Sequence, residues 1–341
     1  MSAVRQALAG SGEQVVEIGP RIEGLIRSWQ CGQFGLSLRA LLLYAQWGDW
    51  NERRPGVVVA GEDMLLGVGL YHRPDGWHLH AVCPQGGQRA PWIRTIARQL
   101  LAAGLVDRVY VRHLTPSAER EFLAAGFVPP ERYPWLPDSP AEDETHPHRL
   151  VSLPEIMSGR QRALRLAFRR FANFLRRSQA LFWLVPLSPD SYPLAAAVVR
   201  DHLQVTGKPL AAHDCEILFR LPLPNSDPYV SLLCWLQTGS ARIPVGVFLG
   251  EQTGKTSGAL YVNVARRDPA VLEMLGCQDA TGFSAIAAFL HAQLFATLLV
   301  RGWQKLDLGG SETPSLDRFK QTIGARPLVT RWVVLTRAEL T

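Results

Sequence analysis

The C-terminal part of this 341-residue chain constrains the fold more than any other stretch. Residues 303–308 alternate enough to predict a short strand, and the small residues 309–311 end it. Residues 316–323 fit two turns of helix, and residues 332–335 predict a final strand because they are rich in β-forming side chains. The order strand, glycine turn, short helix, strand favours an α/β or α+β fold.

This string resembles the C-terminal signature of the Fem-type peptidyltransferases and their relatives in the GCN5-related N-acetyltransferase (GNAT) superfamily. The resemblance is carried by the strand end Asp307 to Gly310, the pair Phe319-Lys320 and the pair Gly324-Ala325. Elsewhere the resemblance lies only in the order of the elements. It implies an α/β (α+β) fold of two GNAT-like domains in tandem, each a mixed, mostly antiparallel sheet flanked by helices.

A proline-rich stretch at residues 129–148 marks the best domain boundary. It contains six prolines and a short acidic run, which predicts an extended linker between domains 1–148 and 149–341. With no third ligand nearby for a metal, His146 and His148 are expected to be solvated linker histidines. The N-terminal half follows the GNAT order, but its glycine-containing loop at residues 84–91 departs from the family's coenzyme-binding pattern. We therefore expect that domain to have lost its coenzyme site.

The charge of the chain favours a phosphate-rich partner. The formal net charge is +6 and the isoelectric point about 9.3, which suits tRNA or a nucleotide-bearing acyl carrier. A helix is predicted from about residue 159 to residue 178, and it places four arginines within roughly 60° of one another. That row is either a solvated basic face or a surface that contacts phosphates, and the Fem relatives also carry an arginine-rich helix here. The candidate nucleic-acid-binding residues are Arg162, Arg165, Arg169 and Arg176.

Other patterns exclude several classes of protein. The five cysteines are scattered without metal or redox spacing, so we expect free thiols in a reducing cytoplasm and no metal site. The N-terminus has no apolar core of a signal peptide. Residues 283–300 are apolar but interrupted by polar side chains, which favours a buried core helix over a membrane span. We expect a cytoplasmic protein without a membrane span.

The resemblance implies amide-bond formation. An amine of the acceptor attacks the ester carbonyl of an aminoacyl-tRNA, and the site must stabilise the oxyanion that develops. The resemblance assigns the stabilisation of this oxyanion to Lys320 and places Phe319 in the same site. Gly309 and Gly310 would let backbone N–H groups approach a substrate carbonyl. The other candidate substrate-binding residues are Ser311, Asp307 and Tyr261.

Several questions stay open at the level of sequence. Candidates for the general base are Asp307, Glu312 and His291, and the substrate itself is a further alternative. The chemistry requires no cofactor beyond aminoacyl-tRNA as a co-substrate. An N-acyltransferase that uses acyl-coenzyme A would share the fold, and so would a non-catalytic module that binds RNA or protein. A lipid-directed transferase is less favoured because no membrane span is predicted. Neither the amino acid, the amine acceptor nor the oligomeric state can be read from the sequence.

Overall fold

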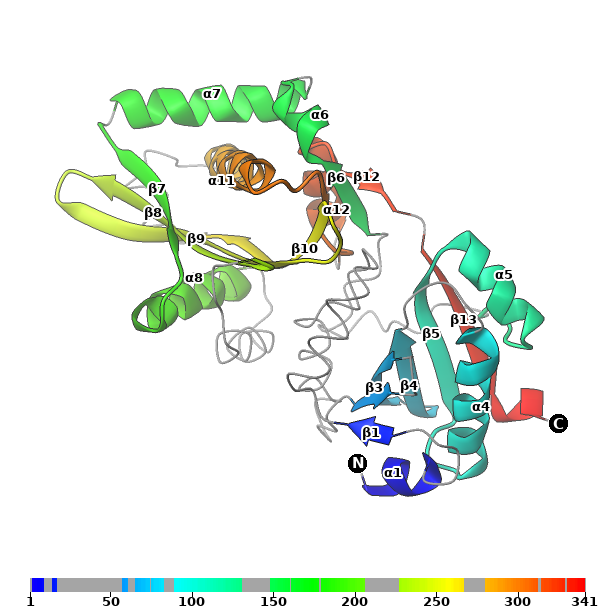
Figure 1. The fold of residues 1–341 in the computed structure, drawn as a ribbon. Helices are drawn as coiled ribbons and strands as arrows, with labels where there is room; N and C mark the ends of the chain where they lie inside the picture. Colours follow the sequence, from blue (N-terminus) through cyan, green and yellow to red (C-terminus); the bar gives the residue numbers. More distant parts are fainter. Residues whose placement is uncertain are drawn as a thin grey trace. The chain divides into compact units, whose positions relative to one another are not determined.

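The computed structural model describes residues 2–8, 14–16, 57–60, 65–73, 75–82, 89–130, 148–159, 161–177, 179–205, 227–266, 280–311, 314–328 and 330–340. The chain folds into two compact units, one of residues 1–135 with 329–341 and one of residues 136–328. Figure 1 shows the elements of each unit, coloured along the sequence. Residues 84–88 of the predicted coenzyme loop, most of the proline-rich linker, His146 and Glu312 lie outside the described residues.

The first unit is built on a mixed sheet. Its described strands have the order β1-β2-β3-β4-β5-β13, and only the pair β4–β5 is parallel. The strands are β1 Gln14–Val16, β2 Val57–Ala60, β3 Leu65–Arg73, β4 Gly76–Val82, β5 Arg108–Leu114 and β13 Arg331–Thr336. The helices are α1 Ser2–Leu8, α4 Arg89–Ala102 and α5 Pro116–Ala124. Helix α4 connects the two parallel strands, as the sequence analysis expected of a GNAT-like domain.

The last strand differs from the predicted domain division. The 149–341 domain was expected to keep β13, but that strand pairs antiparallel with β5 in the sheet of the first unit. Val333 and Leu335 are buried in the core that this sheet forms with α4 and α5. Trp332 and Val334 face the other side, against Tyr110. The β-forming residues of this stretch predicted a strand, but they carry no information about which sheet receives it.

The second unit repeats the same arrangement. Its described strands have the order β12-β6-β11-β10-β9-β8-β7, with one parallel pair, β10–β11. They are β6 Arg149–Ser152, β7 Leu181–Pro186, β8 Tyr229–Thr238, β9 Ala241–Gln252, β10 Ser257–Ala265, β11 Lys305–Asp307 and β12 Arg326–Pro327. The helices are α6 Leu153–Met157, α7 Arg162–Arg177, α8 Tyr192–Val205, α11 Ala280–Val300 and α12 Pro314–Thr322.

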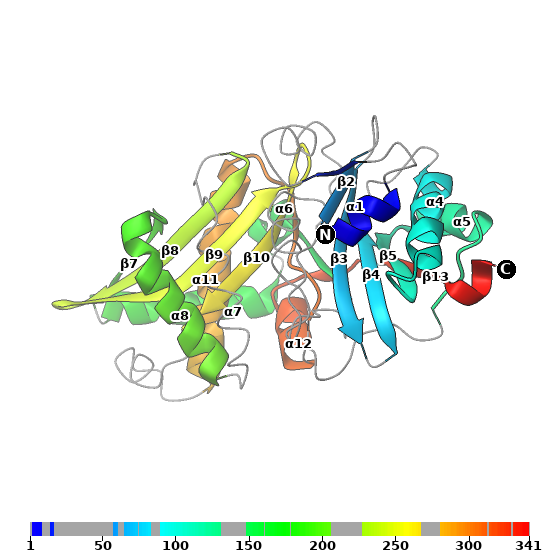
Figure 2. The same cartoon turned by 90° about the horizontal axis from the view of Figure 1, so that it is seen from below.

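Helices cover both faces of the second sheet. Helices α7 and α11 lie on one face and α8 on the other, which Figures 1 and 2 show from two directions. The core lies mainly between α11 and the sheet, and α11 is buried along most of its described length. The prediction of a buried core helix at residues 283–300 is therefore confirmed over most of residues 286–298, whereas Val300 at the end of the helix is exposed. No helix in the described part of the chain combines the length and apolarity needed to cross a membrane.

Candidate active site

The candidate site lies where β10 and β11 stop pairing. Strand β11 pairs with β10 over only three residues, and the chain beyond Asp307 follows β6 instead. Strand β10 continues to Ala265 and carries an irregularity in its pairing with β9 at Tyr261. Such bulges redirect side chains and are frequent beside functional sites. The half-buried Tyr261, predicted to bind substrate, therefore lies on the strand that borders this point.

Lys320 is buried beside the glycines that follow β11. Its side chain is 5% exposed, which rules out the simple reading of a solvated helix lysine. The Nζ atom donates to the carbonyl oxygen of Gly309 at 3.1 Å and to that of Gly310. Gly309 has φ +70°, a conformation that favours glycine and turns its carbonyl as the strand ends. These two bonds orient the ammonium.

The Gly-Ala pair of the signature ends helix α12. Gly324 has φ +92°, the left-handed conformation that commonly follows the last turn of a helix. The N–H of Ala325 then donates to the carbonyl oxygen of Lys320 at 3.0 Å. A side chain at position 324 would also meet Gln161 at about 3.0 Å. This part of the resemblance therefore fixes the end of the helix that carries Lys320.

Asp307 is occupied by two interactions. Its carboxylate accepts the N–H of Gly309 at 2.8 Å and the Nδ1 of His148 at 3.1 Å. We predicted that the Gly309 N–H could donate to a substrate carbonyl. This geometry does not favour that role, because the N–H already donates to the Asp307 carboxylate. His148 itself is buried, so the expectation of a solvated linker histidine was wrong. The signal that sequence reasoning missed is its position directly before a strand.

A buried ion pair fixes helix α12 to β6. Arg149 donates two parallel hydrogen bonds to Asp317, at 2.8 and 2.7 Å. Gln321 donates to the same carboxylate at 2.6 Å. Bidentate pairs of this kind add geometric specificity to their energy. This pair holds the helix one turn before Lys320, and sequence reasoning did not identify either residue.

Phe319 and His291 meet next to Lys320. The ring of Phe319, half-buried on α12, lies 5.2 Å from that of His291 on α11. Burial lowers the pKa of His291 from 6.5 to about 4, and the Lys320 ammonium lowers it too, against the hydrogen bond with Ala287. The ring is therefore neutral at neutral pH. Of the predicted general bases, Glu312 lies outside the described residues and the Asp307 carboxylate is already engaged.

Other predicted residues are also placed. Ser311, predicted to bind substrate, is fully buried directly after the two glycines. Cys234 is a buried free thiol whose pKa is raised by burial, and the other four cysteines lie outside the described residues. Within the described part of the chain, no group of three His, Cys, Asp or Glu side chains is arranged to hold a metal ion.

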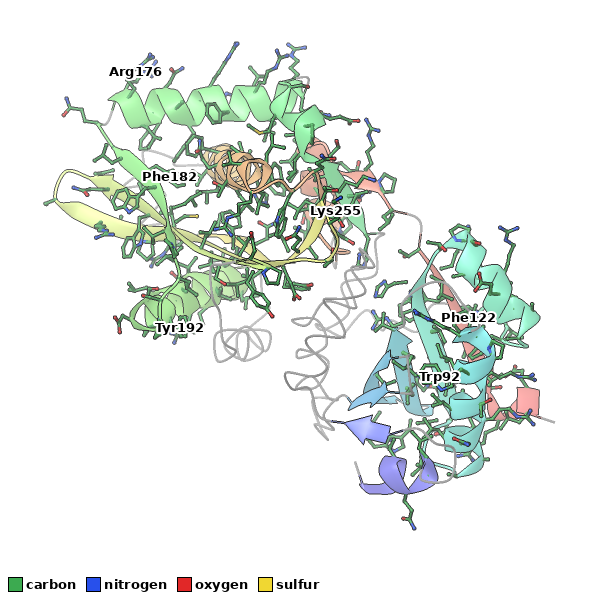
Figure 3. The ribbon with its side chains drawn as sticks, in the orientation of Figure 1. Trp92, Phe122, Arg176, Phe182, Tyr192 and Lys255 are labelled. Atoms are coloured by element: carbon green, nitrogen blue, oxygen red, sulfur yellow. The ribbon has the colours of Figure 1, made fainter. Side chains whose placement is uncertain are left out.

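The predicted arginine row lies on the outer face of α7. The four predicted arginines are exposed, and so are Arg170 and Arg177, which the sequence analysis did not include. Arg176 points away from the sheet, whereas Phe182 of β7 lies toward α11, 5.1 Å from Phe289 (Figure 3). Leu164 and Phe171 bury the inner face of the helix.

We call this surface the α7 arginine face; it consists of Arg162, Arg165, Arg169, Arg170, Arg176 and Arg177. Its formal positive charge equals the net charge of the whole chain. The helix contains six arginines and no acidic residue, while the formal net charge of the whole chain is +6. The rest of the sequence is thus formally neutral. None of the six forms an ion pair within the described residues. A surface depression of about 480 Å³ lies beside Arg170, Asn173, Phe174 and Arg177.

Comparison with known proteins identifies the fold. No family model and no curated protein sequence matches the chain. Among solved structures, FemX superimposes with a TM-score of 0.61 at 9% identity, covering 95% of this chain and 97% of FemX. A conserved protein of unknown function from Bacteroides thetaiotaomicron gives 0.60 at 10% identity, covering 94% of this chain and 98% of that protein.

A third neighbour is the C-terminal domain of a putative lysylphosphatidylglycerol synthetase from Agrobacterium fabrum. Its TM-score is 0.56 at 14% identity, with 94% of this chain and 93% of that chain covered. These likenesses confirm the predicted Fem-like fold at the level of structure.

Proposed function

We propose that the protein is an acyltransferase that forms an amide bond by moving an aminoacyl group from aminoacyl-tRNA to an amine acceptor. The observation that carries this proposal is the buried ammonium of Lys320, fixed by two backbone carbonyls at the point where β10 and β11 part. Attack on an ester carbonyl develops negative charge on its oxygen. A fixed cation away from bulk water stabilises that charge more strongly than the same cation in solution.

The α7 arginine face supports tRNA as the donor. Arginine binds phosphate with planar, bidentate geometry, and a row of such side chains matches the backbone of a nucleic acid. The face is exposed and lies in the same unit as Lys320. Likeness to FemX and to the lysylphosphatidylglycerol synthetase domain supports the same class of reaction by analogy of fold alone.

The transfer assay uses radiolabelled aminoacyl-tRNAs and a panel of primary amines. We expect a loss of label from tRNA that depends on the amine. Lys320→Met should lower the rate by about 10²- to 10³-fold, as removal of one oxyanion-stabilising group does in other enzymes. Lys305→Met is the matched control, because Lys305 is an exposed lysine of the same unit, and it should leave the rate unchanged.

Two outcomes would contradict the proposal. One is the absence of amine-dependent transfer from every charged tRNA. The other is an equal rate in Lys320→Met and Lys305→Met. Calorimetry with acetyl-coenzyme A tests the alternative that the donor is acyl-coenzyme A. Micromolar binding of acetyl-coenzyme A, without transfer from tRNA, would favour that donor.

Binding of tRNA is tested separately from transfer. Fluorescence anisotropy should show that the double variant Arg165→Gln/Arg169→Gln binds tRNA more weakly than wild type. A plot of the logarithm of the binding constant against the logarithm of the salt concentration should also be flatter, by about one unit of slope for each phosphate that the variant no longer neutralises. The control Arg120→Gln/Arg200→Gln makes the same change in net charge at exposed arginines of α5 and α8. Equal binding by the two double variants would exclude the α7 arginine face as the tRNA site.

A further inference from the structure

Two buried hydrogen-bond acceptors lack a donor among the described residues of the second unit. One is Nε2 of His291 on α11, and the other is Oδ1 of Asn263 on β10. His291 is 3% exposed. A buried polar atom without a partner costs about 1–3 kcal/mol, so each such atom in a folded protein requires an explanation.

The hydrogen bond of the other ring nitrogen fixes the character of Nε2. Nδ1 of His291 lies 2.6 Å from the carbonyl oxygen of Ala287. A carbonyl oxygen only accepts, so Nδ1 must carry the hydrogen and Nε2 of the neutral ring has a lone pair. The rings of Phe248, Phe295 and Phe319 surround the imidazole at 5.8, 5.8 and 5.2 Å. The imidazole is thus held in one orientation by aromatic packing.

Asn263 lies on the same side of the sheet. It is the cross-strand partner of Phe248, and side chains of directly paired residues project from the same face. Phe248 contacts His291, so Asn263 is also on the face toward α11. His291 and Asn263 are therefore both neighbours of Phe248 on the α11 side of the sheet, and Asn263 lies on the strand β10 that borders the candidate site.

The positive charge of Lys320 determines which protonation state of a ligand can bind beside these acceptors. Buried acceptors require N–H or O–H donors, and the Lys320 ammonium lies near enough to influence His291 electrostatically. A second ammonium would be repelled by that cation. An uncharged amine satisfies both conditions, because it donates N–H groups without positive charge. It is also the form whose lone pair can attack a carbonyl.

We propose that Nε2 of His291 binds the attacking amine and accepts its proton during transfer, with Asn263 as a second acceptor in the same amine subsite. This rests on the proposed function. The nitrogen lone pair forms the C–N bond to the ester carbonyl carbon, and one N–H proton passes to Nε2. The C–O bond to the ribose then breaks with its electron pair on oxygen. That oxygen takes the proton from Nε2, which restores neutral His291 and leaves an amide and a free ribose hydroxyl.

Two substitutions separate binding from proton transfer. In His291→Gln the side-chain oxygen keeps an acceptor near the position of Nε2 but cannot carry a proton. Its kcat should fall about 10²- to 10⁴-fold with little change in the KM of the amine. His291→Phe removes the acceptor as well and should also raise that KM. His202→Gln is the control, since His202 also bonds a backbone carbonyl, at 3.0 Å, but lies on α8 on the opposite face of the sheet.

The substitution to Phe guards against a folding artefact. The surroundings of the ring are aromatic, and Phe removes a buried polar atom without a partner, so the variant should unfold at the same or a higher urea concentration. An active wild type with an equally active His291→Gln or His291→Phe variant would overturn the proposal. A variant as stable as wild type with lost transfer supports it.

Amine binding is also measured without tRNA. Isotope-edited NMR follows the Nε2 signal of His291, assigned by its loss in His291→Gln, during addition of methoxyamine, a small amine that is uncharged at neutral pH. We expect a saturable shift of that signal in wild type and a weaker response in Asn263→Leu. An Nε2 signal that methoxyamine leaves unchanged overturns the amine subsite. If transfer from tRNA fails but the signal shifts, the donor assignment falls and the amine subsite stands.

Discussion

Protonation of His291 should destabilise the second unit as the pH falls from about 6.5 to about 4. The pKa is lowered from 6.5 to about 4 by burial, with a further contribution from Lys320 and an opposing one from the bond to Ala287. The unfolded chain therefore binds this proton at a higher pH than the folded protein does. The free energy of unfolding is unaffected by this group above pH 6.5, falls between pH 6.5 and 4, and levels off below.

The size of the effect follows from the shift. Each pKa unit corresponds to about 1.4 kcal/mol, so a shift from 6.5 to about 4 removes about 3 kcal/mol at acid pH. The side chain is 3% exposed, so solvent screening does little to reduce this value. Of the groups that pack around the ring, Phe248, Phe295 and Phe319 do not titrate, and Lys320 is the charged neighbour.

The measurement compares wild type with His291→Phe. Urea unfolding, followed by circular dichroism between about pH 7 and pH 4, gives the difference in stability of the two proteins. Their carboxylates are shared, so acid effects unrelated to His291 cancel. We expect the variant to gain about 3 kcal/mol relative to wild type over this range. A difference that does not change with pH, or an NMR titration midpoint of His291 near its ordinary value, would refute the reasoning.

Two further predictions concern the packing that supports the site. Asp317→Asn leaves the buried Arg149 guanidinium without its charged partner and should lower the free energy of unfolding by about 3–5 kcal/mol, measured by urea unfolding. An unchanged midpoint would show that the pair does not hold α12. Gly258→Ala would place a methyl group 2.0 Å from the ring of Trp303, so its unfolding midpoint should fall well below that of Gly239→Ala. At Gly239 nothing lies within 4 Å, and the left-handed backbone alone should cost about 1–2 kcal/mol. Equal midpoints would contradict the described packing.

Local patterns predicted much of what the structure shows. The apolar run at residues 283–300, interrupted by a few polar side chains, predicted a buried core helix rather than a membrane span. The resemblance to the Fem-type signature implied that Asp307, Gly309, Gly310 and Lys320 share one site. They meet in the structure because a strand, a glycine turn and a short helix return the chain onto itself within a few residues. The helical spacing of the arginines on α7 predicted an exposed row, since residues at such intervals share one face.

Contacts between distant parts of the chain could not be predicted in this way. Arg149 and Asp317 are 168 residues apart, and His148 and Asp307 are 159 apart, so no local spacing links them. The burial of His148 follows from the pairing of β6 with β11. The sequence at that position indicates only a histidine between a proline-rich stretch and a strand, not the partner that buries it.

The sequence alone therefore predicted the type and order of most elements from short-range periodicity and turns, and its resemblance to the Fem-type signature implied the fold and the grouping of residues around Lys320. Tertiary structure decided that β13 pairs with β5 in the first sheet, that the Arg149–Asp317 pair fixes α12, and that Nε2 of His291 and Oδ1 of Asn263 are buried without a donor among the described residues. The physical reason is that a strand or side chain carries a preference for a kind of environment. Only the packed chain decides which partner supplies that environment.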